Sequence, residues 1–370
     1  MNMHTGNPTS FSQMSDEERL KHLGAFQAET RQFKEAKQAL QRLYRGWQTT
    51  NDAHLLLISG DSAVGKTTVV DDIIYEQEQE WMGIVTDGKS EIHEPQGPLP
   101  PTVGITKEGP NGFIRPISKV FVEPKARARG LLRDTLHALG VRTNVHETFG
   151  ELMDRLQRHV VAQKVRLLIL DEVHHVVEGH GSSTAYEAVE VIKMLLLQAR
   201  VQIACVGLPV TETILDRNPE LPRHCRGRIK MVPFERELSP RSDYIRFLKA
   251  LSRELPFDKP PNLTESDLAL RMHLATGGFI GHIINLVHAA AEISIERGLE
   301  ALPQTLLAEA YKNISGAPAA DNPFSPEIMD DATVTRLAKR GDQRRDEGKA
   351  ADREGKRPRN PKNKPDFTKR

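Results

Sequence analysis

The stretch of sequence that decides the fold is Gly60-Asp61-Ser62-Ala63-Val64-Gly65-Lys66-Thr67-Thr68. It matches the phosphate-loop pattern G-x-x-x-x-G-K-[ST]. The apolar run Leu55–Ile58 before it predicts a buried strand, and residues 69–75 after it predict a helix. Glycines let backbone amides wrap a phosphate chain, and the start of the helix adds the positive end of its dipole. The order of strand, loop and helix therefore predicts a nucleotide-binding site.

All nine residues of this stretch are expected to contact the nucleotide, and two of them through specific side-chain chemistry. The ammonium of Lys66 is expected to reach the β- and γ-phosphates of ATP, and the hydroxyl of Thr67 to ligate Mg²⁺. The cofactors that the sequence predicts are therefore ATP and Mg²⁺.

A second motif indicates what the nucleotide is for. Its sequence is Arg166-Leu167-Leu168-Ile169-Leu170-Asp171-Glu172, an apolar run that is too short for a helix and ends in two carboxylates. This pattern is typical of a Walker B strand. Asp171 is expected to hold Mg²⁺, and Glu172 to orient and deprotonate the water that attacks the γ-phosphate. The second carboxylate favours an ATPase, because a simple nucleotide switch does not need it.

The rest of the chain alternates strand-like and helix-like patterns. Strands are predicted at 118–122 and 201–207, and helices at 129–139 and 186–197, with a loop or short hairpin between Gly83 and Asn111. This order around a phosphate loop predicts an α/β fold of the P-loop type, with a parallel sheet flanked by helices. After Pro233, a run of helices is predicted at 244–255, 265–275, 279–297 and 304–314.

These patterns predict four parts. They are an amphipathic helical extension (1–50), an α/β nucleotide-binding subdomain (51–235), a helical lid (236–316) and a disordered basic tail (317–370). We expect the apolar face of the extension to pack on the nucleotide-binding subdomain, with partner binding as the alternative.

Net charge is +1 over 370 residues, but the charge is unevenly distributed. Residues 336–370 hold 14 lysines and arginines against 6 acidic residues, with almost no large apolar side chains. Such a tail cannot bury enough surface to fold alone. It either contacts nucleic acid or a partner protein, or is simply a solvated segment.

No run of sequence approaches the roughly 18 apolar residues of a membrane span, and residues 1–15 lack a hydrophobic signal region. The sequence therefore predicts a cytoplasmic protein without a membrane partner. The two cysteines, Cys205 and Cys225, form neither a disulfide framework nor a C-x-x-C pair.

Several segments carry a resemblance to a known family. They are Leu170–Gly179, Ile203–Pro209, Asn218–Leu221 leading to Arg226, Val232–Phe234 and Gly277–Gly281. With the Walker motifs, these segments make residues 45–315 resemble the AAA+ ATPases, and within them the TniB/TnsC family of transposition regulators.

The resemblance implies a function. In that family, ATP-bound subunits assemble as rings or helical filaments on double-stranded DNA, mark the target and recruit the transposase, and hydrolysis drives disassembly. It also implies a target-selection protein as a partner. Arg226 takes the arginine-finger position, where a neighbouring subunit's guanidinium stabilises charge on the γ-phosphate. Arg223 and Arg228 are close enough in sequence to be rivals.

DNA contacts are expected from Lys125, Arg127 and Arg129, in the segment that faces the central channel in this family. Alternate basic residues suit phosphate contact, although a solvated helix N-terminus is the alternative.

His174, His175 and His180 match no zinc signature.

The chain departs from the AAA+ pattern at two positions. Gly207-Leu208-Pro209 stands where a polar sensor is usual, and Gly281-His282 where many members carry an arginine, so hydrolysis is expected to be slow. His282 is either a γ-phosphate donor or structural.

An initiator or helicase-loader ATPase and a non-hydrolysing nucleotide-dependent scaffold remain the alternative functions.

Overall fold

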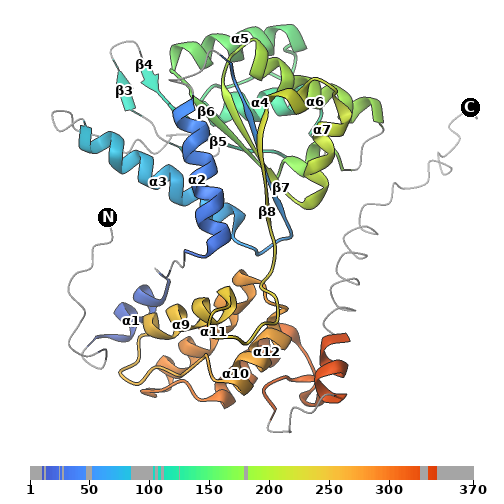
Figure 1. The fold of residues 1–370 in the computed structure, drawn as a ribbon. Helices are drawn as coiled ribbons and strands as arrows, with labels where there is room; N and C mark the ends of the chain where they lie inside the picture. The colour runs from blue at the N-terminus through green and yellow to red at the C-terminus, as the bar shows by residue number, and fades with distance from the viewer. Residues whose placement is uncertain are drawn as a thin grey trace, which may run out of the picture.

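The computed structural model describes residues 11, 14–24, 26, 29–46, 52–84, 103–104, 107–109, 112–124, 126–178, 182–325 and 332–339. An α/β body lies on one side of the molecule and a helical subdomain, the lid, on the other (Figure 1). The chain passes from the body to the lid directly after the edge strand β8.

The sheet of the α/β body has six described strands in the spatial order β2-β5-β6-β7-β1-β8. Their bounds in this order are Val103–Gly104, Ile117–Phe121, Leu167–Asp171, Gln202–Gly207, Leu55–Gly60 and Cys225–Met231. The last five strands are parallel, and β2 runs antiparallel to β5. The parallel sheet predicted from the sequence is confirmed.

Helices cover both faces of the sheet, which explains why its central strands read as continuous apolar runs rather than alternating ones. Leu56 and Ile58 of β1 face α2 (Arg31–Gly46) and α3 (Lys66–Ile84). Leu55 and Leu57 face the opposite layer. That layer is formed by α4 (Ala128–Ala138), α5 (Phe149–Ala162) and α6 (Ser182–Leu197).

Short elements complete the body. Turns of 3₁₀ helix follow β6 and β7 at Val173–Val176 and Pro209–Thr213, and α7 (Ile214–Arg217) and α8 (Leu221–His224) lead into β8. A small antiparallel hairpin joins β3 (Lys107–Gly109) to β4 (Gly112–Ile114). The hairpin agrees with the predicted loop or hairpin, although residues 85–102 lie outside the described chain.

The two N-terminal helices pack on different parts of the molecule. Helix α2 packs against the sheet, as expected. Helix α1 (Asp16–Gly24) packs instead on the lid, where Leu23 joins the apolar core. The Arg19 guanidinium donates to the carbonyl of Pro256 at 3.0 Å and lies 5.3 Å from the centre of the Phe257 ring. These contacts explain why the expectation was wrong for α1.

The lid contains four helices: α9 (Asp243–Glu254), α10 (Ser266–Thr276), α11 (Ile280–Glu296) and α12 (Gln304–Ser315). Its core continues past α12, because Phe324 is buried in it and the side-chain amide of Asn322 donates to the carbonyl of Ala308 at 2.7 Å. A further helical segment covers residues 332–339, with Leu337 buried. The predicted start of a disordered tail at 317 is therefore too early. Residues 340–370 lie outside the described chain.

Among the described helices, none is by itself long and apolar enough to cross a membrane; only α10 and α11 taken together, bent by 112°, reach that length and composition.

Asp134 on α4 makes the stability of the body depend on pH. Its carboxylate accepts a hydrogen bond from the Glu123 amide at 3.2 Å, but burial raises its pKa from 3.8 to about 6. The folded protein thus holds this proton more tightly than the unfolded chain does. The stability that this group contributes is therefore lost as pH rises through about 6.

We predict that Asp134→Asn, which keeps the acceptor and removes the charge, raises the melting temperature by a few degrees at pH 8 and leaves it unchanged near pH 4. Thermal unfolding across this range measures the effect, and Asp154→Asn on the exposed face of α5 is the control. An equal shift at every pH would contradict the prediction.

Candidate nucleotide-binding site

The phosphate loop joins the carboxyl end of β1 to the first residue of α3. All six residues of β1 are buried, so the strand holds the loop rigidly at the edge of the sheet. Two of its glycines are required by geometry. A Cβ on Gly60 would lie 2.2 Å from the carbonyl oxygen of Met231 in β8, and Gly65 has a φ of +95°.

Lys66 is held inside this loop. The side chain is buried, and its ammonium donates hydrogen bonds to the carbonyls of Gly60 and Asp61, both at 2.8 Å. Burial lowers the pKa of Lys66, and the neighbouring Glu172, Asp171 and Asp61 oppose this shift. The loop therefore places a buried ammonium group next to the N-terminus of α3, and both the charge and the helix dipole favour an anionic ligand.

The Walker B carboxylates lie at the same edge of the sheet. Asp171 is the buried last residue of β6, and the Glu172 amide donates to its Oδ1 at 3.0 Å. Glu172 itself has a φ of +56°, in the left-handed region that non-glycine residues rarely adopt. Burial raises the pKa of Glu172, and the charge of Asp171 adds to the rise, while Lys66 and Lys119 oppose it. Lys66, Asp171 and Glu172 thus form one electrostatic cluster.

Lys119, in the middle of β5, is a member of this site that the sequence analysis missed. Its ammonium lies 2.8 Å from Asp71 Oδ1 on α3 and 3.4 Å from Asp171 Oδ2. It thus fixes the Walker B aspartate from the side opposite the phosphate loop. The signal was a single charged residue, Lys119, in the strand Ile117–Phe121, where withdrawing a charge from water requires a partner.

The residues predicted to hold Mg²⁺ fit a hard cation by their chemistry. Asp171 offers a buried carboxylate and Thr67 an exposed hydroxyl on the first turn of α3, and oxygen atoms of these types are the ligands that Mg²⁺ prefers.

The lid contacts the phosphate loop directly. The amide of Gly281, in the first turn of α11, donates to the carbonyl of Ala63 at 2.9 Å. A Cβ on Gly281 would lie 3.0 Å from the Cβ of Ala63, so the helix approaches the loop as closely as a glycine allows. Phe279 is buried in the same apolar cluster as α2 and α3. The sequence pattern marks the glycines at 277, 278 and 281, but it does not indicate that Gly281 contacts the phosphate loop.

His282 follows on α11. Its ring lies 5.1 Å from that of Phe279, and its Nδ1 lies 3.4 Å from the carbonyl of Thr276. It also lines a cavity of about 570 Å³ within the lid, together with Arg236, Tyr311 and Leu337. Its role as a phosphate donor stays a prediction.

Arg226 lies far from the phosphate loop of its own chain. It is the second residue of β8, and its neighbour Cys225 pairs with Leu55 at the start of β1. Met231 pairs with Gly60 at the other end. Five residues of strand separate the two positions, roughly 16 Å. The exposed Arg226 therefore lies at the end of β8 opposite its own phosphate loop, while the rivals Arg223, before β8, and Arg228, in its middle, are exposed too.

The predicted DNA contacts are only partly described. Arg127 and Arg129 are exposed at the amino end of α4, and Arg127 makes no side-chain capping hydrogen bond there. Lys125 and His180 lie outside the described residues.

The sheet order, the phosphate loop, the Walker B strand and the helical lid together define a P-loop protein of the AAA+ class. Solved structures share this fold. The match to the Aeropyrum pernix ORC1 protein in complex with DNA has a TM-score of 0.54 and 14% identity, and covers 82% of this chain and 73% of that one. The match to the Aeropyrum pernix ORC2 protein has a TM-score of 0.53 and 13% identity, and covers 80% of this chain and 72% of that one. The match to Drosophila ORC bound to DNA has a TM-score of 0.52 and 12% identity, and covers 87% of this chain and 71% of that one. At such identities the likeness shows the fold alone.

A narrower assignment comes from the sequence. Residues 81–226 match the profile of the family described as TniB, Bacterial TniB protein. The resemblance to TniB-type AAA+ proteins is thereby confirmed over this part of the chain. No curated protein matches the sequence.

The contact between lid and loop generates a prediction. Gly281→Val should push α11 away from Ala63 and weaken ATP binding about tenfold or more, because an added side chain in this close contact forces a backbone shift. A fluorescent ATP analogue measures the affinity. Gly150→Val is the matched control, since Gly150 is also the second residue of a helix but has open space around it. Equal affinities in the two variants would contradict the prediction.

Proposed function

We propose that this protein is an ATP-dependent, DNA-binding AAA+ ATPase that assembles on duplex DNA and regulates transposition by marking a target and recruiting the transposase. The observation that carries the proposal is the cluster of Lys66, Asp171 and Glu172 at the carboxyl ends of the strands, in a chain whose residues 81–226 match the TniB family.

The residues of the cluster have separable roles in this proposal. The phosphate loop binds the triphosphate of ATP, with Lys66 leaving its backbone acceptors to pair with the phosphates. Thr67 and Asp171 hold Mg²⁺, which neutralises phosphate charge when bound. Glu172 orients the attacking water and accepts its proton, a role that its raised pKa favours because a base is most effective when its pKa approaches the working pH.

We predict that Lys66→Ala abolishes ATP binding, whereas Glu172→Gln binds ATP, fails to hydrolyse it and persists on DNA. Nucleotide affinity, phosphate release and filter-bound DNA are measured for both. Wild-type affinity in Lys66→Ala would refute the assignment of the site. Slow or absent turnover in the wild type, with tight ATP and DNA binding, would instead favour a non-hydrolysing scaffold.

Assembly is proposed to complete the site. Arg226 cannot reach the phosphate loop of its own chain, so as an arginine finger it must act on a neighbouring subunit. Hydrolysis then depends on contact between subunits. This arrangement suits a protein that forms rings or filaments, with a transposase and a target-selection protein as further partners.

A subunit-mixing experiment tests this role. Arg226→Ala and Glu172→Gln should each be inactive alone, but mixtures should recover turnover at interfaces that combine an intact Glu172 with an intact Arg226. Lys230→Ala, exposed on the same strand, is the control and should retain activity alone. If co-assembled mixtures stay inactive at every ratio, Arg226 is not the finger and Arg223 is tested next.

Contacts to DNA phosphates are proposed for Lys125, Arg127 and Arg129. Their combined alanine variant should bind all DNA sequences more weakly and lower the salt slope of binding by about one unit for each lost contact. Binding across a salt series measures this effect, with Arg158→Ala on α5 as the control. An unchanged slope would move the contact elsewhere, first to the basic tail beyond Arg336.

The folds of the ORC proteins named above keep an initiator-type ATPase as the second candidate, since two of those structures contain DNA. Dependence of transposition on this protein in a reconstituted reaction separates the two.

A further inference from the structure

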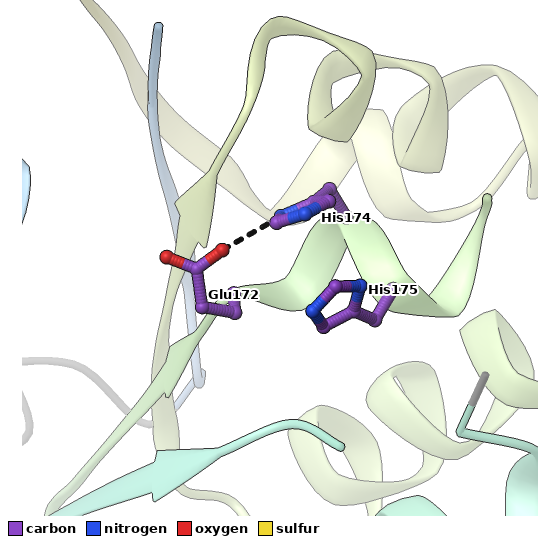
Figure 2. Close-up of side chains that lie close together, drawn as sticks. All are labelled: Glu172, His174 and His175. Carbon is purple, nitrogen blue, oxygen red and sulfur yellow. Dashed lines mark ion pairs between the residues drawn. The ribbon is translucent and has the colours of Figure 1, made fainter. Parts of the chain in front are cut away.

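A buried histidine lies beside the carboxylate that we propose as the general base. His174 is 4% exposed, and its Nδ1 lies 3.2 Å from Oε2 of Glu172. Figure 2 shows the two side chains pointing toward one another. On the other side of the ring, Nε2 lies 3.9 Å from Oε2 of Glu178. The imidazole therefore lies between two carboxylates, with one of them near each ring nitrogen.

The turn that carries His174 is rigid. Val173 and Val176 on either side are fully buried. The His175 amide donates to the carbonyl of Glu172 at 3.0 Å, and the Glu178 amide donates to that of His174 at 2.9 Å. Because backbone and side chain are both fixed, His174 restrains where the Glu172 carboxylate can lie.

The end of β7 makes room for this ring. A Cβ on Gly207 would lie 3.3 Å from His174 Nδ1 and 2.5 Å from Thr211 Oγ1, so a side chain at 207 would displace one of them. Gly207 is also the position where the sequence analysis expected a polar sensor and found none. The His174 imidazole therefore lies next to Gly207 at the end of β7, the position where a polar sensor side chain is usual.

We propose that His174 is a positioning residue for hydrolysis: it holds the Glu172 carboxylate toward the attacking water, and it supplies from the Walker B side the polar contact that Gly207 does not offer. This inference rests on the proposed ATPase function, because it needs Glu172 to act as the base.

A metal centre is the competing explanation of the same side chains. The ligand atoms of Glu172, His174 and His175 lie within 4.8 Å of one another. The two explanations differ in what they require of His175, because a metal would use all three side chains, whereas positioning needs only His174.

The test measures ATP affinity with a fluorescent analogue and turnover by phosphate release, with DNA present. His174→Ala should lower kcat about 100-fold, as expected when a reacting group is misplaced, and leave ATP affinity within about twofold of wild type. His174→Asn should recover part of kcat, because an amide can still bond the carboxylate, and His174→Leu should not. His175→Ala is the matched control and should stay close to wild type.

A double variant tests whether His174 acts through Glu172. In the Glu172→Asp background, which keeps a carboxylate but draws it away from His174, His174→Ala should lower turnover much less than it does in the wild type, since coupled residues are not additive. Unchanged kcat in His174→Ala, or equal losses in His174→Ala and His175→Ala, would overturn the inference while the ATPase proposal stands. Absence of turnover in the wild type would overturn both together.

Discussion

The parallel pairing of β1 between β7 and β8 is the constraint on which the rest of the structure depends. Because the strands are parallel, their carboxyl ends lie on the same side of the sheet, and the phosphate loop after β1 therefore lies near Asp171 and Glu172 at the end of β6. The same pairing moves the amino end of β8, with Arg226, to the opposite edge. The pairing of β1 with β8 therefore separates the phosphate loop, which acts within the chain, from Arg226, which is proposed to act on a neighbouring chain.

Buried charge is the second feature that shapes this edge. Lys66 and Lys119 approach the carboxylates from two sides, and each is largely withdrawn from water. Because desolvation penalises each charge and its partners compensate, the arrangement is stable only as a set. The lid adds to this set through Gly281 and Ala63, which gives a route by which a change at the phosphates can reach the helical subdomain.

The sequence was sufficient to predict the elements that obey local rules. The phosphate loop, the Walker B strand and the four lid helices lie where their patterns indicated, and the predicted ends of the strand and helices differ from the observed ends by no more than about two residues. What it could not supply were contacts between distant residues: the packing of α1 on the lid, the ion pair of Lys119 with Asp171, and the approach of α11 to the loop. Helix α5 was missed although Thr148 and Glu151 form a capping box that the sequence displays. The site residues carried by the family resemblance alone, Arg226 and the basic segment near 127, stay predictions.

The central claim is that the phosphate loop and the first turn of α11 together form the nucleotide-binding site. Hydrogen exchange of the wild-type protein, with and without saturating ATP and Mg²⁺, tests it most directly. The account predicts slower amide exchange in residues 60–68 and 279–283 together, with little change in α5. Protection of neither segment at a nucleotide concentration that saturates binding would contradict it, and protection of the loop alone would remove the lid from the site.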